Sequence, residues 1–377
     1  MSGIEKFRIA LIKQLSNIPG WRTKKKIVIF ESDDWGAIRT PSLEVFKKLS
    51  ENNISVFDPF SNYDSLESQT DLEQLFNVLR SIKDINGHYP VFSANCVVSN
   101  PDFEKIAKSG FKEYHYEMVT ETFKKYPNHK SSFKLWQEGL NEHIFYPQYH
   151  GREHINPSQW LKLLNAGNQA YRYAFMLNTY SVNSREEGSK RNNLLATLDF
   201  DNEYQKQQVQ KALLEGLSIF NSLFGFKSNS FTPPCYIWDK ETENLLAQNG
   251  IKFIKTSRTQ SIPNPGGGGY FKKYHYTGEK NSFNQFYQVR NCLFEPSLKP
   301  NINWVKACLN SIDVAFKWHK PAIISSHRLN YIGSINESNR SNNITLLKEL
   351  LQTIVLRWPD VEFLNSKQLG ELILNNE

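Results

Sequence analysis

Short runs of β-forming residues alternate with longer amphipathic runs along most of this chain, and this alternation limits the folds it can adopt. The first strand is predicted at 27–30, and a second at 91–98. A long helix is predicted over 203–224, because Gly225 follows it and favours a helix end. The remaining predicted strands are 230–231, 251–255, 322–326 and 361–364, and the remaining helices are 42–51, 101–108, 156–167, 239–249, 302–318, 344–357 and 366–374. The pattern predicts an α/β fold with a mainly parallel sheet or barrel.

The composition is that of a globular protein. The 377 residues suffice for one large domain or two of ordinary size. A hydrophobic fraction of 39% and a charged fraction of 22% exclude a disordered chain. No apolar run approaches the ~20 residues that cross a bilayer, and basic residues interrupt the apolar N-terminus, so no signal peptide is predicted. The four cysteines form no CxxC pair, which favours reduced thiols and a cytoplasmic protein.

The formal net charge is +7, and much of the excess lies in residues 1–26. We predict a basic amphipathic segment over 1–26 and a single domain over 27–377. The apolar residues of the segment follow helical spacing, and they are Ile4, Phe7, Leu11, Leu15 and Ile18. The segment is therefore expected either to pack on the domain or to contact the anionic inner face of a membrane. Nucleic acid is not predicted as a partner, because no zinc-finger or RNP-like motif occurs.

Several polar side chains follow predicted strands, where the active sites of α/β folds gather. Asp33 and Asp34 come after 27–30. Adjacent carboxylates at a strand end point in different directions, so one can bind a metal while the other acts as a base. Asp-Asp shortly before a glycine is also ordinary turn chemistry. His327 ends the run 322–326, where an imidazole can serve as a general acid or as a structural hydrogen-bonding group.

A pair of histidines, His150 and His154, has the spacing at which two imidazoles can meet on one side of a helical turn. Paired imidazoles suit zinc and other transition metals. Surface histidines at this spacing also occur without a metal. Two histidines and one aspartate nevertheless make a three-ligand set that leaves coordination positions open, as a catalytic metal requires.

Four aromatic residues are candidates for contacts with a sugar. Tyr236 and Trp238 belong to a proline-stiffened turn over 230–239, where they could form a wall against a sugar ring. Trp35 follows the paired carboxylates, and Tyr331 follows the strand that ends in His327. Each of these rings could equally belong to the core.

The order of these pieces resembles that of the NodB-like polysaccharide deacetylase family: Asp-Asp at the first strand, His-x-x-x-His, a Phe-x-Pro-Pro turn and a strand-borne His. The pieces spread over most of the chain. The resemblance implies a distorted (β/α) barrel of the polysaccharide deacetylase type and removal of N- or O-acetyl groups from a carbohydrate. By position it implies Asp33 as the base, His327 as the acid and a backbone N–H near Cys235 that helps to bind the oxyanion. It implies one divalent metal ion, zinc by the chemistry of its ligands, held by Asp34, His150 and His154.

Two features depart from the pattern of that family. Thr232 stands where the family has an arginine that braces the base, and Cys235 stands where it has an aromatic residue. We expect Asp33 to keep its proton to a higher pH in consequence, unless another arginine takes that place. The candidates for this arginine are Arg152, Arg258 and Arg328. The family's aspartate that orients the acid has no clear counterpart, and the candidates for it are Asp239 and Asp313.

The predicted reaction is metal-assisted hydrolysis of an acetyl group on a carbohydrate. A metal-dependent glycosyltransferase is one alternative, in which acidic residues hold the ion on a nucleotide sugar. That alternative gives no role to His150, His154 or His327. A carbohydrate-binding protein of the same fold without turnover is the other alternative, and Thr232 in place of the arginine is compatible with it.

Overall fold

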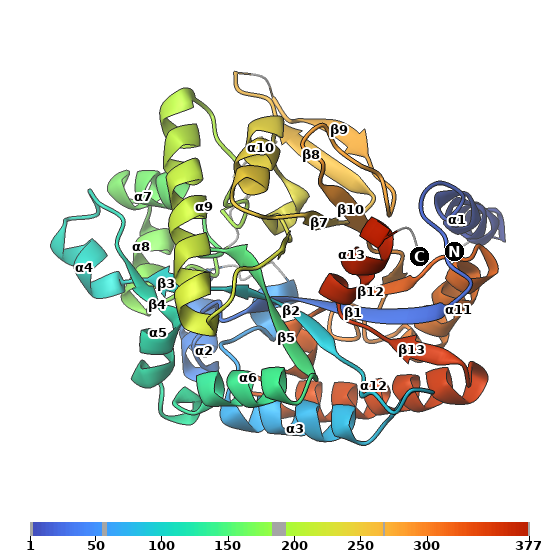
Figure 1. Cartoon of the computed structure of the whole chain (residues 1–377). Helices are drawn as coiled ribbons and strands as arrows, with labels where there is room; N and C mark the ends of the chain where they lie inside the picture. Colours follow the sequence, from blue (N-terminus) through green and yellow to red (C-terminus); the bar gives the residue numbers. More distant parts are fainter. Residues whose placement is uncertain (1–2, 55–58, 183–193, 267, 376–377) are drawn as a thin grey trace.

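The computed structural model describes residues 3–54, 59–182, 194–266 and 268–375. A curved nine-stranded sheet forms its centre (Figure 1), and the strand pairs within this sheet are parallel. Its strands are β1 (Lys26–Trp35), β2 (Phe92–Val97), β5 (Phe145–Gly151), β6 (Ser230–Phe231), β7 (Phe253–Thr256), β10 (Phe286–Val289), β11 (Cys292–Leu293), β12 (Ala322–His327) and β13 (Val361–Phe363). Their order is β10-β7-β6-β5-β2-β1-β12-β11, with β13 beside β1. The sheet curls into a half-barrel, which confirms the predicted α/β barrel class.

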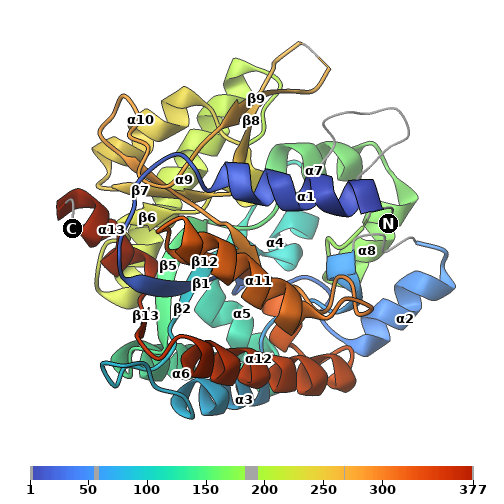
Figure 2. The same ribbon diagram turned by 90° about the vertical axis from the view of Figure 1, so that its right-hand side faces the viewer.

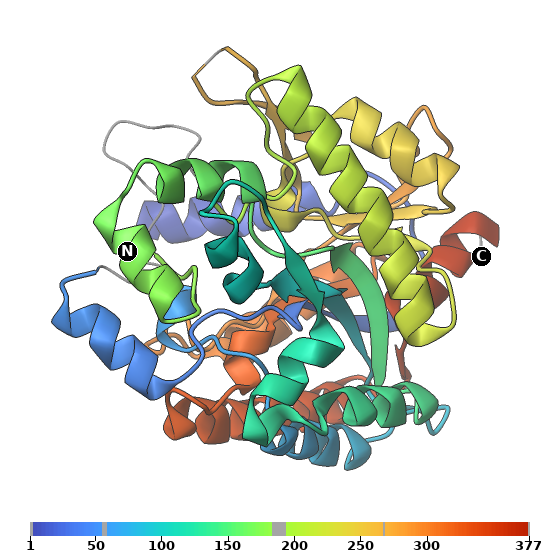
Figure 3. The same cartoon turned by 90° about the vertical axis from the view of Figure 1, so that its left-hand side faces the viewer.

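Helices surround this half-barrel. They are α1 (Gly3–Ser16), α2 (Leu43–Glu51), α3 (Gln69–Arg80), α4 (Phe103–Lys108), α5 (Val119–Lys125), α6 (Ser132–Asn141), α7 (Pro157–Asn165), α8 (Gln169–Met176), α9 (Glu203–Phe224), α10 (Lys240–Gln248), α11 (Trp304–Lys317), α12 (Glu337–Arg357) and α13 (Ser366–Asn375). In Figures 1 and 2, α3, α6 and α12 form a layer below the sheet, and α1 lies next to α11. Figure 3 shows α9 running diagonally across another side of the half-barrel. None of the helices within the described ranges is both long and apolar enough to span a bilayer.

Capping residues in the sequence correctly predicted where α7 begins and where α9 ends. Asn156 caps α7 and accepts a hydrogen bond from the backbone N–H of Gln159, and Pro157 occupies the first helical position. Gly225 ends α9 with a φ of 74°. The prediction for α12 was too short, because Asn336 caps this helix and starts it at Glu337 instead of residue 344.

An antiparallel hairpin interrupts the parallel pattern, and the sequence did not predict it. Its strands are β8 (Thr259–Pro263) and β9 (Tyr270–Tyr274), and the sequence between them is rich in glycine. A second small antiparallel pair joins β3 (Ser99–Pro101) to β4 (Tyr116–Met118). The predicted division into 1–26 and 27–377 stays a prediction, although α1 does precede β1 as a separate element.

Side chains alternate between the two faces of β1, as the geometry of a strand requires. Val28 and Phe30 pack into the largest apolar cluster, on the side of α3, α11 and α12. Ile27 and Ile29 face the other way and pack against α13. The next residue on this inner face is Glu31, whose carboxylate is buried. The inner face of β1 is thus apolar at its start and charged toward its carboxyl end.

Glu31 is neutralised by a lysine from across the half-barrel. The Nζ of Lys255, on β7, lies 3.1 Å from Oε2 of Glu31, and both side chains are buried. Asn95, on β2, accepts a hydrogen bond from Lys255 and donates one to Glu31. Burial lowers the pKa of Lys255, and the charge of Glu31 opposes this shift. Together with Asn95, this ion pair links β1, β2 and β7.

Lys255→Met should therefore destabilise the fold by about 3–5 kcal/mol, because the nearest cation left to the buried carboxylate of Glu31 is Arg290, 3.8 Å away and already paired with Asp33. Adding Glu31→Gln to this variant should restore most of the loss, since no uncompensated charge then remains. Denaturant unfolding measures both effects. Lys273→Met, at an exposed position on β9, is the control and should change stability by less than about 0.5 kcal/mol. Equal stability of the Lys255 and Lys273 variants would contradict the argument.

Candidate metal centre and catalytic residues

The paired carboxylates lie within β1 and not after it, because this strand continues to Trp35. Simple alternation would turn Asp34 away from the inner face. Its φ of 75°, together with a register shift against β2, instead forms a bulge that re-aims the side chain. Gly36 follows with a φ of 83°, and a Cβ there would lie 2.9 Å from the carbonyl oxygen of Val97. The chain therefore needs a glycine beside the bulge that positions Asp34.

A second bulge positions His150. On β5, Tyr149 pairs with Cys96 and Gly151 pairs with Val97, so His150 is the extra residue. His154 lies in the irregular loop that leads to α7. The prediction that the two histidines share a helical turn is therefore wrong: a strand end and a loop bring them together, with ring centroids 5.1 Å apart.

The two imidazoles converge on one oxygen of Asp34. Its Oδ1 lies 3.4 Å from Nε2 of His150 and 3.1 Å from Nε2 of His154. All three side chains are buried. Burial lowers the pKa of His154, although the charge of Asp34 opposes this, so a neutral imidazole is favoured there. Two imidazole nitrogens and a carboxylate oxygen within 4.8 Å of one another form a set that could bind a metal ion.

His150 is also oriented from behind, as histidine ligands of metals usually are. Its Nδ1 lies 2.7 Å from the carbonyl oxygen of Thr232, which can only accept, so Nδ1 is the donor and Nε2 is directed at Asp34. Thr232, which stands where the family has an arginine, thus contributes its backbone oxygen to the site. This contact depends on the turn after β6 and not on the threonine side chain.

Asp33 is braced by Arg290, which follows β10. Two nitrogens of the guanidinium lie 2.6 Å from Oδ1 and 2.5 Å from Oδ2 of Asp33, and Asn95 donates a further hydrogen bond to Oδ1. Burial by itself would raise the pKa of Asp33, but the charge and hydrogen bonds of Arg290 outweigh it and hold this pKa well below its usual range. Asp33 therefore does not keep its proton to a higher pH, because an arginine does take the expected place, although it is none of the three candidates.

The three arginines proposed from the sequence have other partners. Arg152 pairs with Glu153 and Glu215, and Arg328 pairs with Asp64 and Glu67. Arg258 lies 5.9 Å from the ring centroid of Tyr274. The sequence could not single out Arg290, because it stands in no motif and reaches Asp33 only through the curvature of the sheet.

His327 is the register partner of Asp33 on the neighbouring strand β12. Its Nε2 lies 3.7 Å from Oδ2 of Asp33, and its Nδ1 lies 2.6 Å from Oε1 of Glu295. Asn330 donates a hydrogen bond to the other oxygen of Glu295. Burial would lower the pKa of His327, but the charge and hydrogen bond of Glu295 outweigh this and raise it to about 9.

Glu295 therefore takes the place expected for an orienting aspartate, and both sequence candidates for that role are wrong. Asp239 caps α10 and pairs with Lys206. Asp313 lies on α11 and pairs with Lys317. A glutamate just after the short strand β11 carries no sequence signal beyond its position at a strand end.

A buried chain of alternating charges supports Asp34, and sequence reasoning missed it. Arg39 donates to Oδ2 of Asp34 at 3.0 Å, and its Nε lies 3.4 Å from Asp64. Arg328 then bridges Asp64 and Glu67, at 2.9 and 2.8 Å. Oδ2 of Asp34 is thus occupied by Arg39, while Oδ1 faces the histidines. Because Arg328 directly follows His327, this series of ion pairs links the candidate metal ligands to the segment that carries the candidate acid.

The turn after β6 brings one of the four candidate aromatic residues to the site. The hydroxyl of Tyr236 accepts a hydrogen bond from Arg290 at 3.0 Å, and its side chain is partly exposed. Cys235 and Tyr236 have φ values of 55° and 54°, so the backbone of this turn is held in a left-handed conformation. The role of the backbone near Cys235 in binding an oxyanion stays a prediction.

The other three aromatic residues belong to the core, which corrects their prediction as sugar contacts. Trp35 packs edge-on against Phe145, and Trp238 and Tyr331 have no exposed surface. Their polar atoms are occupied inside the protein. The partners are Ser32 for Trp35, Glu243 for Trp238 and Ser326 for Tyr331. A ring that is packed and hydrogen-bonded on all sides offers no face to a ligand.

No protein-family model matches the chain, and no curated protein matches it. Solved structures resemble it in fold. A polysaccharide deacetylase-like protein from Mycobacterium smegmatis is 12% identical with a TM-score of 0.44, covering 95% of this chain and 93% of its own. A probable polysaccharide deacetylase from Pseudomonas aeruginosa PAO1 is 9% identical with a TM-score of 0.45, covering 92% and 91%. Puue allantoinase is 10% identical with a TM-score of 0.44, covering 94% and 92%. Sequence identities and TM-scores this low carry no argument about function. The function is therefore argued below from the side chains of the site.

The convergence of Asp34, His150 and His154 predicts about one divalent ion per chain in protein purified without chelator. His150→Ala or His154→Ala should lower the metal content at least tenfold, because two ligands leave too weak a site. Elemental analysis of each purified variant measures this. His275→Ala is the matched control, since His275 is also buried but lies beside Glu279 and Gln260, outside the ligand set. Full metal content in both ligand variants would refute the assignment.

Proposed function

We propose that this protein is a metal-dependent hydrolase that removes an acetyl group, bound as an amide or an ester, from a carbohydrate. One observation carries the proposal: a buried carboxylate and an imidazole, Asp33 and His327, lie on adjacent strands 3.7 Å apart, directly beside the Asp34, His150 and His154 set. A base, an acid and a metal-ligand set in this arrangement suit hydrolysis of an acyl group. The fold neighbours include polysaccharide deacetylases, but their low similarity to this chain does not carry the proposal.

The proposed roles follow from the environment of each group. When bound, a divalent ion would supply Lewis acidity for the acyl carbonyl and for water. Asp33 is ionised at neutral pH and accepts a proton from the water that attacks the acyl carbon. His327 is protonated at neutral pH and donates a proton to the departing amine or hydroxyl oxygen as its bond to the acyl carbon breaks. Tyr236, held by Arg290, lies where it can contact the sugar, and the backbone near Cys235 is the candidate donor to the oxyanion.

Each of the two alternative functions leaves some residues of this site without a role. A glycosyltransferase that holds a nucleotide sugar through an ion prefers oxygen ligands, and two of the three candidate ligands here are imidazoles. A non-catalytic carbohydrate-binding protein needs neither the ion pair on Asp33 nor the glutamate on His327. Acetate release and nucleotide release, measured on acetylated glycans and on sugar nucleotides, distinguish the three functions.

Asp33→Asn should lower kcat for acetate release by about 10²-fold or more, because an amide cannot accept the proton. It should leave the metal content unchanged, since Asp34 and not Asp33 faces the histidines. Acetate release and elemental analysis on the same preparation test both statements. Asp313→Asn, on the surface of α11, is the control and should keep full activity. A fully active Asp33→Asn variant would mean that the base lies elsewhere.

The pairing of His327 with Glu295 predicts a pH dependence. An acid must be protonated to act, and the pKa of His327 is raised to about 9, so kcat/KM should fall only as the pH rises through about 9. Glu295→Gln removes the charge that raises this pKa, so the alkaline limb should move to lower pH. Glu279→Gln removes the partner of another buried histidine, His275, and should leave the limb in place. An unmoved limb in a folded, metal-loaded Glu295→Gln variant contradicts the role of His327.

We also propose that α1 contacts an anionic membrane surface. Leu11 and Leu15 are 46% and 50% exposed although α1 rests on α11 through Lys13, whose Nζ lies 3.1 Å from Oγ of Ser311. The side chains of Ile4 and Phe7, which the sequence assigned to the same face, lie outside the described residues. Co-sedimentation with vesicles that contain an anionic lipid should occur at low salt and weaken with added salt and in Leu11→Asp. Absence of binding at low salt would refute this contact.

A further inference from the structure

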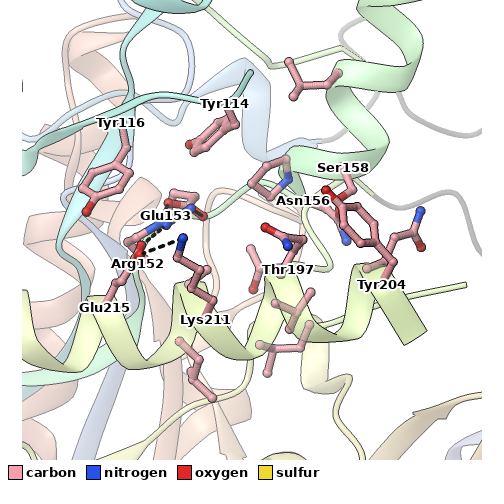
Figure 4. A pocket seen from close by; sticks show the side chains of 18 of the residues that line it. Tyr114, Tyr116, Arg152, Glu153, Asn156, Ser158, Thr197, Tyr204, Lys211 and Glu215 are labelled. Carbon is pink, nitrogen blue, oxygen red and sulfur yellow. Dashed lines mark hydrogen bonds and ion pairs between the residues drawn. The ribbon is translucent and has the colours of Figure 1, made fainter. Parts of the chain in front are cut away.

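A pocket lies behind residues 150–154, the end of β5 and the start of the loop after it (below, the 150–154 loop), which carry the two candidate histidine ligands. It measures about 690 Å³ and lies between α7, α9 and the segment 112–116. His150 and His154 turn toward Asp34, whereas Arg152 and Glu153, between them in sequence, line the pocket. Figure 4 shows these two side chains at one end of the pocket, with α9 along one wall. The same loop thus forms one wall of the pocket and carries two residues of the reaction centre.

The buried cation of this pocket is paired with carboxylates. Arg152 makes two hydrogen bonds to Glu153, at 2.6 and 2.9 Å, and a third to Glu215 at 2.5 Å. Its guanidinium also stacks over the ring of Tyr116, 4.4 Å from the centroid. Lys211, on the rim beside Glu215, is largely exposed. A charged ligand would therefore meet no unpaired counter-charge at depth, and burying its charge there would be unfavourable.

Neutral hydrogen-bonding groups and aromatic rings make up much of the remaining lining. In the described part of the chain, Oγ1 of Thr197 and the hydroxyl of Tyr114 are buried without a hydrogen-bond partner, and both residues line the pocket. Thr197 is nine-tenths buried. Tyr204 is 70% exposed at the start of α9, and Gln208 follows one turn later on the same helix. Hydroxyl and amide groups between tyrosine rings suit a ligand that has both hydroxyls and flat apolar faces.

We propose that this pocket binds a neutral sugar unit of a glycan, separate from the unit whose acetyl group reacts. The inference rests on the proposed function for the identity of the glycan as substrate, but the pocket itself can be tested without turnover. A chain bound here lies against the outer side of the 150–154 loop while another unit lies at Asp33 and His327. The protein should therefore prefer oligosaccharides to single sugars.

Ala212→Trp tests the pocket, because Ala212 lines it from α9 and an indole would fill the space. Leu214→Trp is the matched control, two residues along the same helix, exposed and outside the pocket. The probes are tetramers of N-acetylglucosamine, glucose, mannose and xylose, added to the metal-loaded protein and followed by calorimetry and saturation-transfer NMR. At least one tetramer should bind, and its affinity should fall at least tenfold in Ala212→Trp and in Tyr204→Ala but not in Leu214→Trp.

Catalysis gives a second measurement. The ratio of kcat/KM for an acetylated tetramer to that for the acetylated single sugar should fall at least tenfold in Ala212→Trp and stay at the wild-type ratio in Leu214→Trp. Absence of binding by all four tetramers, or equal binding by the two tryptophan variants, overturns the pocket proposal even if the protein releases acetate. Pocket-dependent binding without acetate release from any substrate overturns the proposed function and leaves the pocket as a glycan site.

Discussion

Burial of three carboxylates on the central strand is the constraint on which the rest of the site depends. Each is almost fully removed from water, so each needs a cation close by to offset the cost of burying its charge. The pairs are Glu31 with Lys255, Asp33 with Arg290 and Asp34 with Arg39. Two of these cations come from the far side of the half-barrel, from β7 and from the end of β10. The curvature of the sheet is therefore also what makes its charged interior tolerable.

These ion pairs also give the neighbouring carboxylates of Asp33 and Asp34 different environments. Arg290 engages both oxygens of Asp33 and keeps it ionised, whereas Arg39 engages a single oxygen of Asp34 and leaves the other facing His150 and His154. The bulge at Asp34 makes this division possible, because without it adjacent residues of a strand would face opposite sides of the sheet. A local backbone irregularity thus allows one strand to supply both the proposed base and a candidate metal ligand.

Much of the fold follows from local signals in the sequence. Asn156 before α7 and Gly225 after α9 mark helix ends through backbone hydrogen bonding that involves only neighbouring residues. The hairpin β8–β9 escaped prediction because its pairing partners lie on either side of a glycine-rich connection and β9 is mostly exposed, which leaves no clear alternation of apolar residues. The order of the strands also depends on contacts between distant segments, which local propensity does not encode.

For the site, the sequence by itself determined which groups could carry chemistry: two carboxylates, a histidine pair and a histidine that ends a strand. Tertiary structure decided what each of them meets. Arg290 and Glu295 stand far from Asp33 in sequence and meet it or His327 only because parallel strands bring their carboxyl ends to one edge. The structure also decided that Trp35 is core and Tyr236 is not, since the exposure of a ring depends on everything packed around it. The residue type sets which reactions a side chain can perform. Its charge state, its orientation and its exposure to a ligand depend on neighbours that only the folded chain brings together.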